Sequence, residues 1–187
     1  GMTFGLAKWG MFEDALNHAT AAFRIGTEIQ HRQRIAGAYY ALGYIYVLML
    51  QADLAIENLE QGLKLAEQFG SAWLIGNTTA DLVNAYLLKG DTSRARSLLD
   101  SVLQIETGHH TRAERRMLWA KGYLFLAENK PSEALRIAEH LLDSKRSSHE
   151  TQPIPALLQL HGDALFALNQ FKKAEQALEG AKLGAEQ

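Results

Sequence analysis

A pair of adjacent histidines is the feature of this sequence closest to a metal-binding pattern: His109 and His110 have Glu106 and Glu114 nearby. Imidazole and carboxylate groups are common ligands of zinc and related metals. A helical zinc motif separates its two histidines by four positions, which places both on one face of the helix. These histidines are adjacent and lie in a predicted turn, so we predict no metal site.

Catalytic motifs are absent from the sequence as well. It has no phosphate-binding loop ending in Gly-Lys-Ser or Gly-Lys-Thr, no Gly-x-Ser-x-Gly elbow and no His-Glu-x-x-His pair. Carboxylate pairs such as Glu57 and Glu60 have helical spacing and are expected on solvent-exposed faces. The absence of cysteine excludes disulfides and a cysteine nucleophile. We predict no catalytic residues, no cofactor and no enzyme activity. The weaker alternative is an enzyme whose active site the sequence motifs do not reveal.

The composition favours a folded protein that binds neither nucleic acid nor membrane. The 187 residues are 47% hydrophobic and 21% charged, with a net charge of −2. This composition is too apolar for a disordered chain. The net charge is not positive, as it would be in a protein that binds nucleic acid through its overall charge. The longest apolar run, near 44–50, is far shorter than the roughly 20 residues that cross a bilayer. The N-terminus shows no signal peptide, and we expect a cytoplasmic protein.

One basic cluster occurs in the sequence, and Glu114 interrupts it. It is small for a nucleic-acid site and is predicted to be the charged surface at the start of a helix. Its members are Arg112, Arg115, Arg116 and Lys121.

A repeated unit organises the whole chain. Alanines that follow a turn recur at intervals of 39 or 40 residues, at Ala15, Ala55, Ala95, Ala134 and Ala174. Good helix formers dominate between them, and each unit has room for two helices with short connections. Isolated helix pairs cannot bury their apolar faces, whereas stacked pairs can. The sequence therefore predicts an array of stacked helix pairs.

Turn residues set the limits of the predicted helices. We expect a stub at 3–9, a helix at 12–28, and the pairs 31–50 with 52–69, 71–89 with 92–107, 111–128 with 131–144, and 154–168 with 170–184. We predict a single repeat domain over 3–187, with a partial repeat at 3–30 and repeats at 31–70, 71–110, 111–150 and 151–187. Since neither end carries a polar capping helix, we expect an excised piece of a longer protein or end-to-end self-association.

The repeat resembles the tetratricopeptide repeat. "YYALGYIY" at 39–46 and "NQFKKA" at 169–174 match that family's Leu-Gly, aromatic and Gly-x-aromatic-x-x-Ala signature, while Val83, Lys121 and Gly62 depart from it. The period is longer than the usual 34 or so residues and is similar to the variant in bacterial signal-transduction ATPases of the maltose-activator type and in ATPase–cyclase proteins. The resemblance implies an all-α, right-handed superhelical array of antiparallel helix pairs, a tetratricopeptide-like α-solenoid.

In such arrays the first helix of each pair lines the concave wall, which implies a binding surface. The positions fifteen, eleven and eighteen residues before the repeat alanines contain Tyr40, Tyr44, Asn77, Asn84, Arg116, Trp119, Tyr123, Gln159 and Asp163. Aromatic and arginine side chains carry much of the energy of recognition surfaces, so we predict that these residues bind a partner. The alternative is that Tyr40 or Trp119 only packs between repeats. Of the clamp by which some family members bind a C-terminal carboxylate, only Asn84 matches.

Two functions follow from this interpretation. The first is a non-enzymatic module for signal transduction that binds a protein segment or peptide, or other domains of a longer parent, in its concave groove. The second is an effector-sensing segment of a multidomain ATPase-type transcription regulator or nucleotide cyclase. A nucleotide-binding, helix-turn-helix or cyclase domain in the parent protein would favour the second.

Overall fold

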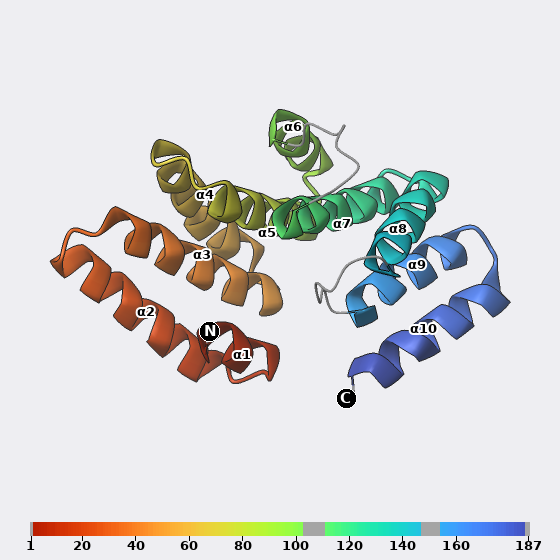
Figure 1. The fold of residues 1–187 in the computed structure, drawn as a ribbon, viewed down its shortest axis with the longest axis horizontal. Helices are drawn as coiled ribbons and strands as arrows, with labels where there is room; N and C mark the ends of the chain where they lie inside the picture. The colour runs from red at the N-terminus through yellow and green to blue at the C-terminus, as the bar shows by residue number, and fades with distance from the viewer. Residues whose placement is uncertain (1, 103–110, 147–153, 186–187) are drawn as a thin grey trace. The chain divides into compact units, whose positions relative to one another are not determined.

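The fold is an array of antiparallel helix pairs (Figure 1). A computed structural model describes residues 2–102, 111–146 and 154–185. The helices in this part of the chain are α1 (Met2–Lys8), α2 (Phe12–Glu28), α3 (Arg32–Leu48), α4 (Ala52–Gln68), α5 (Ala72–Lys89), α6 (Thr92–Val102), α7 (Arg112–Ala127), α8 (Pro131–Arg146), α9 (Ile154–Ala167) and α10 (Phe171–Ala185). The prediction of an all-α, tetratricopeptide-like solenoid of antiparallel helix pairs is confirmed.

Every predicted helix is present, and its ends agree with the sequence-based bounds within two residues wherever the structure describes them. The predicted end of the helix at 92–107 lies outside the described residues. The chain divides into two compact units, Gly1–Gln104 and Ile105–Gln187, which are called unit 1 and unit 2 below. The grouping of both in one domain, with the proposed repeat limits, stays a prediction.

Unit 1 contains three helix pairs whose first helices are α1, α3 and α5. Each first helix packs against the second helix of its own pair, and α3 also packs against α1 and α5. The repeat alanines Ala15, Ala55 and Ala95 are completely buried where these helices meet. A methyl group is small enough to let two backbones come close, which explains why alanine recurs there.

A glycine sets the closest approach within the second pair of unit 1. An added Cβ at Gly43 in α3 would overlap the side chain of Leu59 in α4, which is itself completely buried. Leucine thus fills the space that the missing side chain leaves. In the third pair Val83 takes the glycine position and is also fully buried, so this pair packs with a larger side chain on the first helix.

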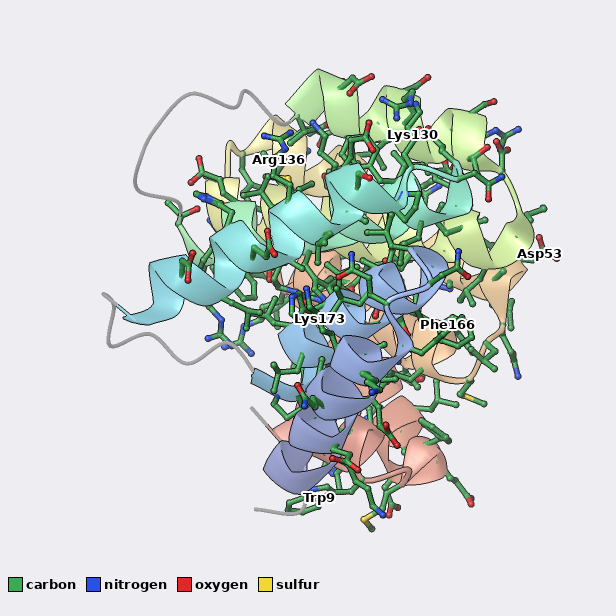
Figure 2. The ribbon with its side chains drawn as sticks, turned by 90° about the vertical axis from the view of Figure 1, so that its right-hand side faces the viewer. Trp9, Asp53, Lys130, Arg136, Phe166 and Lys173 are labelled. Carbon is green, nitrogen blue, oxygen red and sulfur yellow. The ribbon has the colours of Figure 1, made fainter. Side chains whose placement is uncertain are left out.

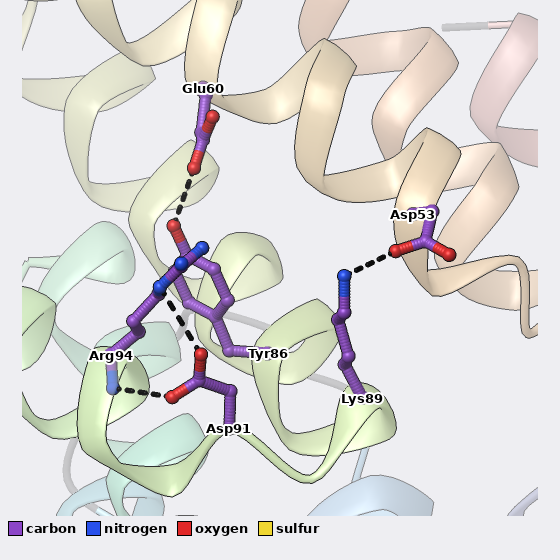
Figure 3. Close-up of polar contacts among 6 residues, drawn as sticks. All are labelled: Asp53, Glu60, Tyr86, Lys89, Asp91 and Arg94. Carbon is purple, nitrogen blue, oxygen red and sulfur yellow. Dashed lines mark hydrogen bonds and ion pairs between the residues drawn. The ribbon is translucent and has the colours of Figure 1, made fainter.

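Polar contacts join α4, α5 and α6 at their surface (Figure 3). The hydroxyl of Tyr86 donates a hydrogen bond of 2.6 Å to Oε1 of Glu60, and Nζ of Lys89 lies 2.6 Å from Oδ1 of Asp53. Burial, with the Glu60 bond second, raises the pKa of Tyr86 to about 12. The phenol therefore stays protonated and acts as a donor at neutral pH. The exposed Lys89–Asp53 pair contributes little to stability by comparison.

Unit 2 repeats the same packing with α7, α8, α9 and α10. An added Cβ at Gly162 in α9 would lie 2.6 Å from Cγ of Leu178 in α10, which is the glycine–leucine contact of unit 1 in another repeat. At Gly122 in α7 the close neighbour is Leu160 of α9, at 2.6 Å from the added Cβ. The sequence explains the difference, because the position that would face Gly122 from its own second helix holds Ala138.

Replacing Gly43 by alanine is expected to destabilise unit 1 by about 1–3 kcal/mol, because the new methyl group overpacks against Leu59. Urea unfolding followed by circular dichroism measures this change in the free energy of unfolding. Gly37→Ala is the matched control in the same helix, since nothing lies within 4 Å of its added Cβ. It is expected to stabilise α3 by about 0.5–1 kcal/mol. Equal effects of the two substitutions would contradict this account of the packing.

Candidate partner-binding surface

In unit 1 the two predicted tyrosines lie in a cluster of aromatic rings. Tyr40 and Tyr44 are 4% and 9% exposed, and their ring centroids lie 6.5 Å apart on α3. The ring of Phe4 in α1 lies 5.3 Å from Tyr40 and 5.2 Å from Tyr44. These distances are typical of favourable aromatic pairs. The two tyrosines therefore contribute to packing between α1 and α3, which is the role that the alternative interpretation gave to Tyr40.

Trp73 at the start of α5 extends this cluster toward solvent. Its ring contacts that of Tyr40 edge-on, with 6.0 Å between the centroids, and it is 56% exposed. Neither Phe4 nor Trp73 was among the predicted site residues. Phe4 could have been found, because it stands eleven residues before Ala15, the position that Tyr44 occupies in the next repeat. Trp73 lies outside the three positions from which the site was predicted.

The two predicted asparagines of unit 1 have different environments. Asn77 is 3% exposed, and its side-chain amide donates a 2.6 Å hydrogen bond to the backbone carbonyl of Trp73 one turn earlier. This bond lies within the first turn of α5, and the buried amide has little access to a binding partner. Asn84 is half-buried in α5 and keeps part of its surface in solvent.

Unit 2 brings three predicted residues together across α7 and α9. The rings of Trp119 and Tyr123 meet edge-on, with centroids 5.0 Å apart and an interplanar angle of 74°. The Tyr123 hydroxyl donates a 3.4 Å hydrogen bond to Oδ2 of Asp163, and Nε1 of Trp119 donates one of 3.2 Å to the carbonyl of Ala156. We name Trp119, Tyr123 and Asp163 the aromatic–acid cluster. All three side chains are partly exposed.

The environment of this cluster shifts two pKa values in the same direction. Burial raises the pKa of Asp163, and the hydrogen bond from Tyr123 lowers it in part. Burial, followed by the charge of Asp163, raises the pKa of the Tyr123 phenol far above its usual value. Tyr123 is therefore protonated at all physiological pH values and orients its proton toward the carboxylate.

The two other predicted residues of unit 2 flank the cluster. Gln159 is exposed one turn before Asp163 on α9, and Arg116 is half-buried one turn before Trp119 on α7. Both lie at the spacing of three or four residues that places side chains on one helix face. Together with the cluster they form a surface of aromatic, amide and charged groups.

A second aromatic pair in unit 2 was missed by sequence reasoning. Phe166 near the end of α9, labelled in Figure 2, is 61% exposed. Phe171 at the start of α10 is 54% exposed, and the centroids of the two rings lie 5.4 Å apart. Phe166 stands three residues after Asp163, so it continues the face that carries this carboxylate. Phe166 could have been predicted from the sequence, because it lies one helical turn after the predicted position of Asp163.

The histidine pair considered for metal binding lies outside the described residues, as does Glu106. Glu114 is described and has a local role: its carboxylate accepts a 2.6 Å bond from the Thr111 amide, while its own amide donates to Oγ1 of Thr111 at 3.2 Å. This capping box begins α7. In the described part of the chain no group of three or more metal-ligating side chains comes together, and no helix there is long and apolar enough to cross a membrane.

The chain is similar to known repeat proteins in both sequence and fold. The family model of the tetratricopeptide repeat matches residues 36–69. Among solved structures, BtubC (BKLC) from P. vanneervenii is similar, with a TM-score of 0.69 and 19% identity over 98% of this chain and 77% of that one. A putative kinesin light chain with nearly identical TPR-like repeats from Podosopora anserina has a TM-score of 0.64 and 16% identity, over 98% of this chain and 92% of that one. No curated protein matches the sequence.

Trp119→Ala is expected to lower the free energy of unfolding by about 2 kcal/mol, less than the 3–5 or so of a fully buried aromatic residue. The reason is that the half-buried ring contacts Tyr123 and bonds to Ala156 across two helices. Urea unfolding followed by circular dichroism measures the loss. Trp9→Ala, at a residue that is 80% exposed, is the matched control and is expected to change stability by no more than about 0.5 kcal/mol. Equal losses for both would contradict the contacts described.

The carboxyl group of Asp163 is expected to titrate above its usual pKa of 3.8 in the folded protein, because burial disfavours its charge. The folded state then binds this proton more tightly than the unfolded state does. The resulting stabilisation is fully present below pH 3.8 and is lost as the pH rises through the folded-state pKa. Carbon-13 NMR of the carboxyl resonance measures the midpoint, with the urea-unfolded protein as the control. A folded-state midpoint at or below that of the unfolded protein would refute the assignment.

Proposed function

The chain carries a tetratricopeptide repeat within a tetratricopeptide-like array of helix pairs, and from this premise we propose that it is a non-enzymatic interaction module. Its ligand is an extended segment of another protein, bound against the first helices of the pairs. This function suits a cytoplasmic protein that assembles others in signal transduction.

The observation that carries the proposal is the aromatic–acid cluster of unit 2. Core aromatic residues are normally buried and apolar in their surroundings, whereas Trp119, Tyr123 and Asp163 combine two rings, an ionisable carboxylate and partial exposure on neighbouring first helices. Large aromatic surfaces with few rotatable bonds give contact area at low entropic cost. Such a surface supports recognition in addition to packing.

The flanking groups suit a peptide backbone. The Gln159 amide has both a donor and an acceptor, and Arg116 has several donors that match carbonyl or carboxylate oxygens. In unit 1, Asn84 is the predicted residue with the same capacity and partial exposure. Tyr40, Tyr44 and Asn77 act there as positioning residues, because the buried tyrosines pack α3 against α1 and the buried Asn77 amide bonds within the first turn of α5.

The test is a screen of the purified chain against a random nine-residue peptide library. Peptides that are retained are expected to bind the wild type at least tenfold more tightly than Trp119→Ala or Gln159→Ala, as measured by fluorescence anisotropy. The matched control is Glu139→Ala on α8, an exposed side chain on a second helix, which is expected to bind as the wild type does. A library from which nothing is retained would refute the proposal. So would peptides that bind the surface variants and the wild type equally.

A further inference from the structure

Asp163 is a half-buried carboxylate that no cation accompanies in the described part of the chain. Its one hydrogen-bond partner there is the Tyr123 hydroxyl, at 3.4 Å from Oδ2. A carboxylate that loses hydration without gaining a positive partner is held at a cost in free energy. Binding of a cation next to such a carboxylate would recover part of this free energy. An unpaired carboxylate of this kind is therefore a candidate site for a positively charged ligand.

From this geometry we propose that the aromatic–acid cluster receives a lysine or arginine side chain of the bound protein segment. The proposal rests on the function proposed above and specifies its ligand. Asp163 supplies the negative charge, and the rings of Trp119 and Tyr123 supply aromatic surface beside it. Cations bind favourably over tryptophan and tyrosine faces, and more so where water is partly excluded.

Three basic side chains near the cluster in sequence are engaged elsewhere. Nζ of Lys121 lies 5.8 Å from the centroid of the Phe125 ring, Lys130 pairs with Glu128 at 2.9 Å, and Lys173 bonds to Gln170 at 3.0 Å. Arg116 is on the same helix as Tyr123 but seven residues away, which is about 10 Å along the axis. Since none of these side chains bonds to Asp163 in the described part of unit 2, we expect the ligand to supply the positive charge.

The charge state of the site agrees with this chemistry. Tyr123 remains protonated, because burial and the nearby carboxylate both raise its pKa. Its hydroxyl is therefore a neutral donor that occupies one oxygen of Asp163 and orients the group. Because the Asp163 carboxylate is already oriented before a basic side chain binds, less side-chain entropy is lost on binding.

The neighbouring Phe166 indicates a second feature of the ligand. Its ring is 61% exposed one helical turn beyond Asp163 and contacts Phe171. Exposed aromatic pairs of this kind match apolar side chains of a partner. We therefore expect the basic residue of the segment to stand next to an apolar one.

The experiment uses the same random nine-residue library against three proteins: wild type, Asp163→Asn and Glu175→Gln. The amide in Asp163→Asn would keep an acceptor for Tyr123 and lose only the charge, while Glu175 is an exposed carboxylate on α10 that controls for net charge. Peptides retained by the wild type and by Glu175→Gln are expected to be enriched in lysine or arginine beside an apolar residue. Asp163→Asn is expected to lose this enrichment.

A second measurement needs no further variant of the protein. Replacing the basic residue of a retained peptide by its neutral analogue, citrulline for arginine or acetyl-lysine for lysine, is expected to weaken binding to the wild type at least tenfold. The same replacement is expected to weaken binding to Asp163→Asn much less, since only the contact of the cation with the rings is left to lose.

The outcomes separate this proposal from the function on which it rests. Retained peptides without basic enrichment, or neutral analogues that bind equally well, would refute the cation site and leave peptide binding intact. Basic enrichment that persists in Asp163→Asn would also refute it. A library that yields no peptide at all would refute both.

Discussion

The close approach of the two helices in a pair is the constraint on which both units depend. At Gly43 the missing side chain is replaced by Leu59, and at Gly162 the same space is filled by Leu178. These contacts join two antiparallel helices whose remaining apolar surface is too small to fold alone. Each pair must therefore stack on a neighbour, and the first helices are brought side by side as a consequence. The candidate surface exists because this stacking repeats.

Stacking of first helices has different results in the two units. In unit 1 it brings Phe4, Tyr40 and Tyr44 into ring contact, and almost all of the tyrosine surface is removed from solvent. In unit 2 the equivalent positions hold a tryptophan, a tyrosine and an acid, and all three side chains are partly exposed. Trp119 is bonded to a backbone carbonyl and Tyr123 to Asp163, so the rings are oriented without being enclosed. Similar backbone geometry thus gives a buried aromatic cluster in one unit and a partly exposed one in the other.

Most of the fold could be predicted from the sequence, because alanine spacing and turn residues act locally and recur in every repeat. The proximity of Tyr123 and Asp163 also follows from their 40-residue separation in equivalent helices. Burial could not be predicted, since it depends on neighbours: the exposure of Tyr40 is set by Phe4 and Trp73, which come from other helices. That the surfaces of both units form one concave wall stays a prediction.

Contacts inside each unit run between helices that are neighbours along the chain or one helix further on. Such a pattern keeps the sequence separation of contacting residues low, and chains with low contact order fold quickly because little loop entropy is lost before contacts form. It also makes each helix pair a modular element, since its removal or duplication breaks contacts only with adjoining pairs. Such an array can accordingly lengthen or shorten by whole pairs, while the packing inside each remaining pair is preserved.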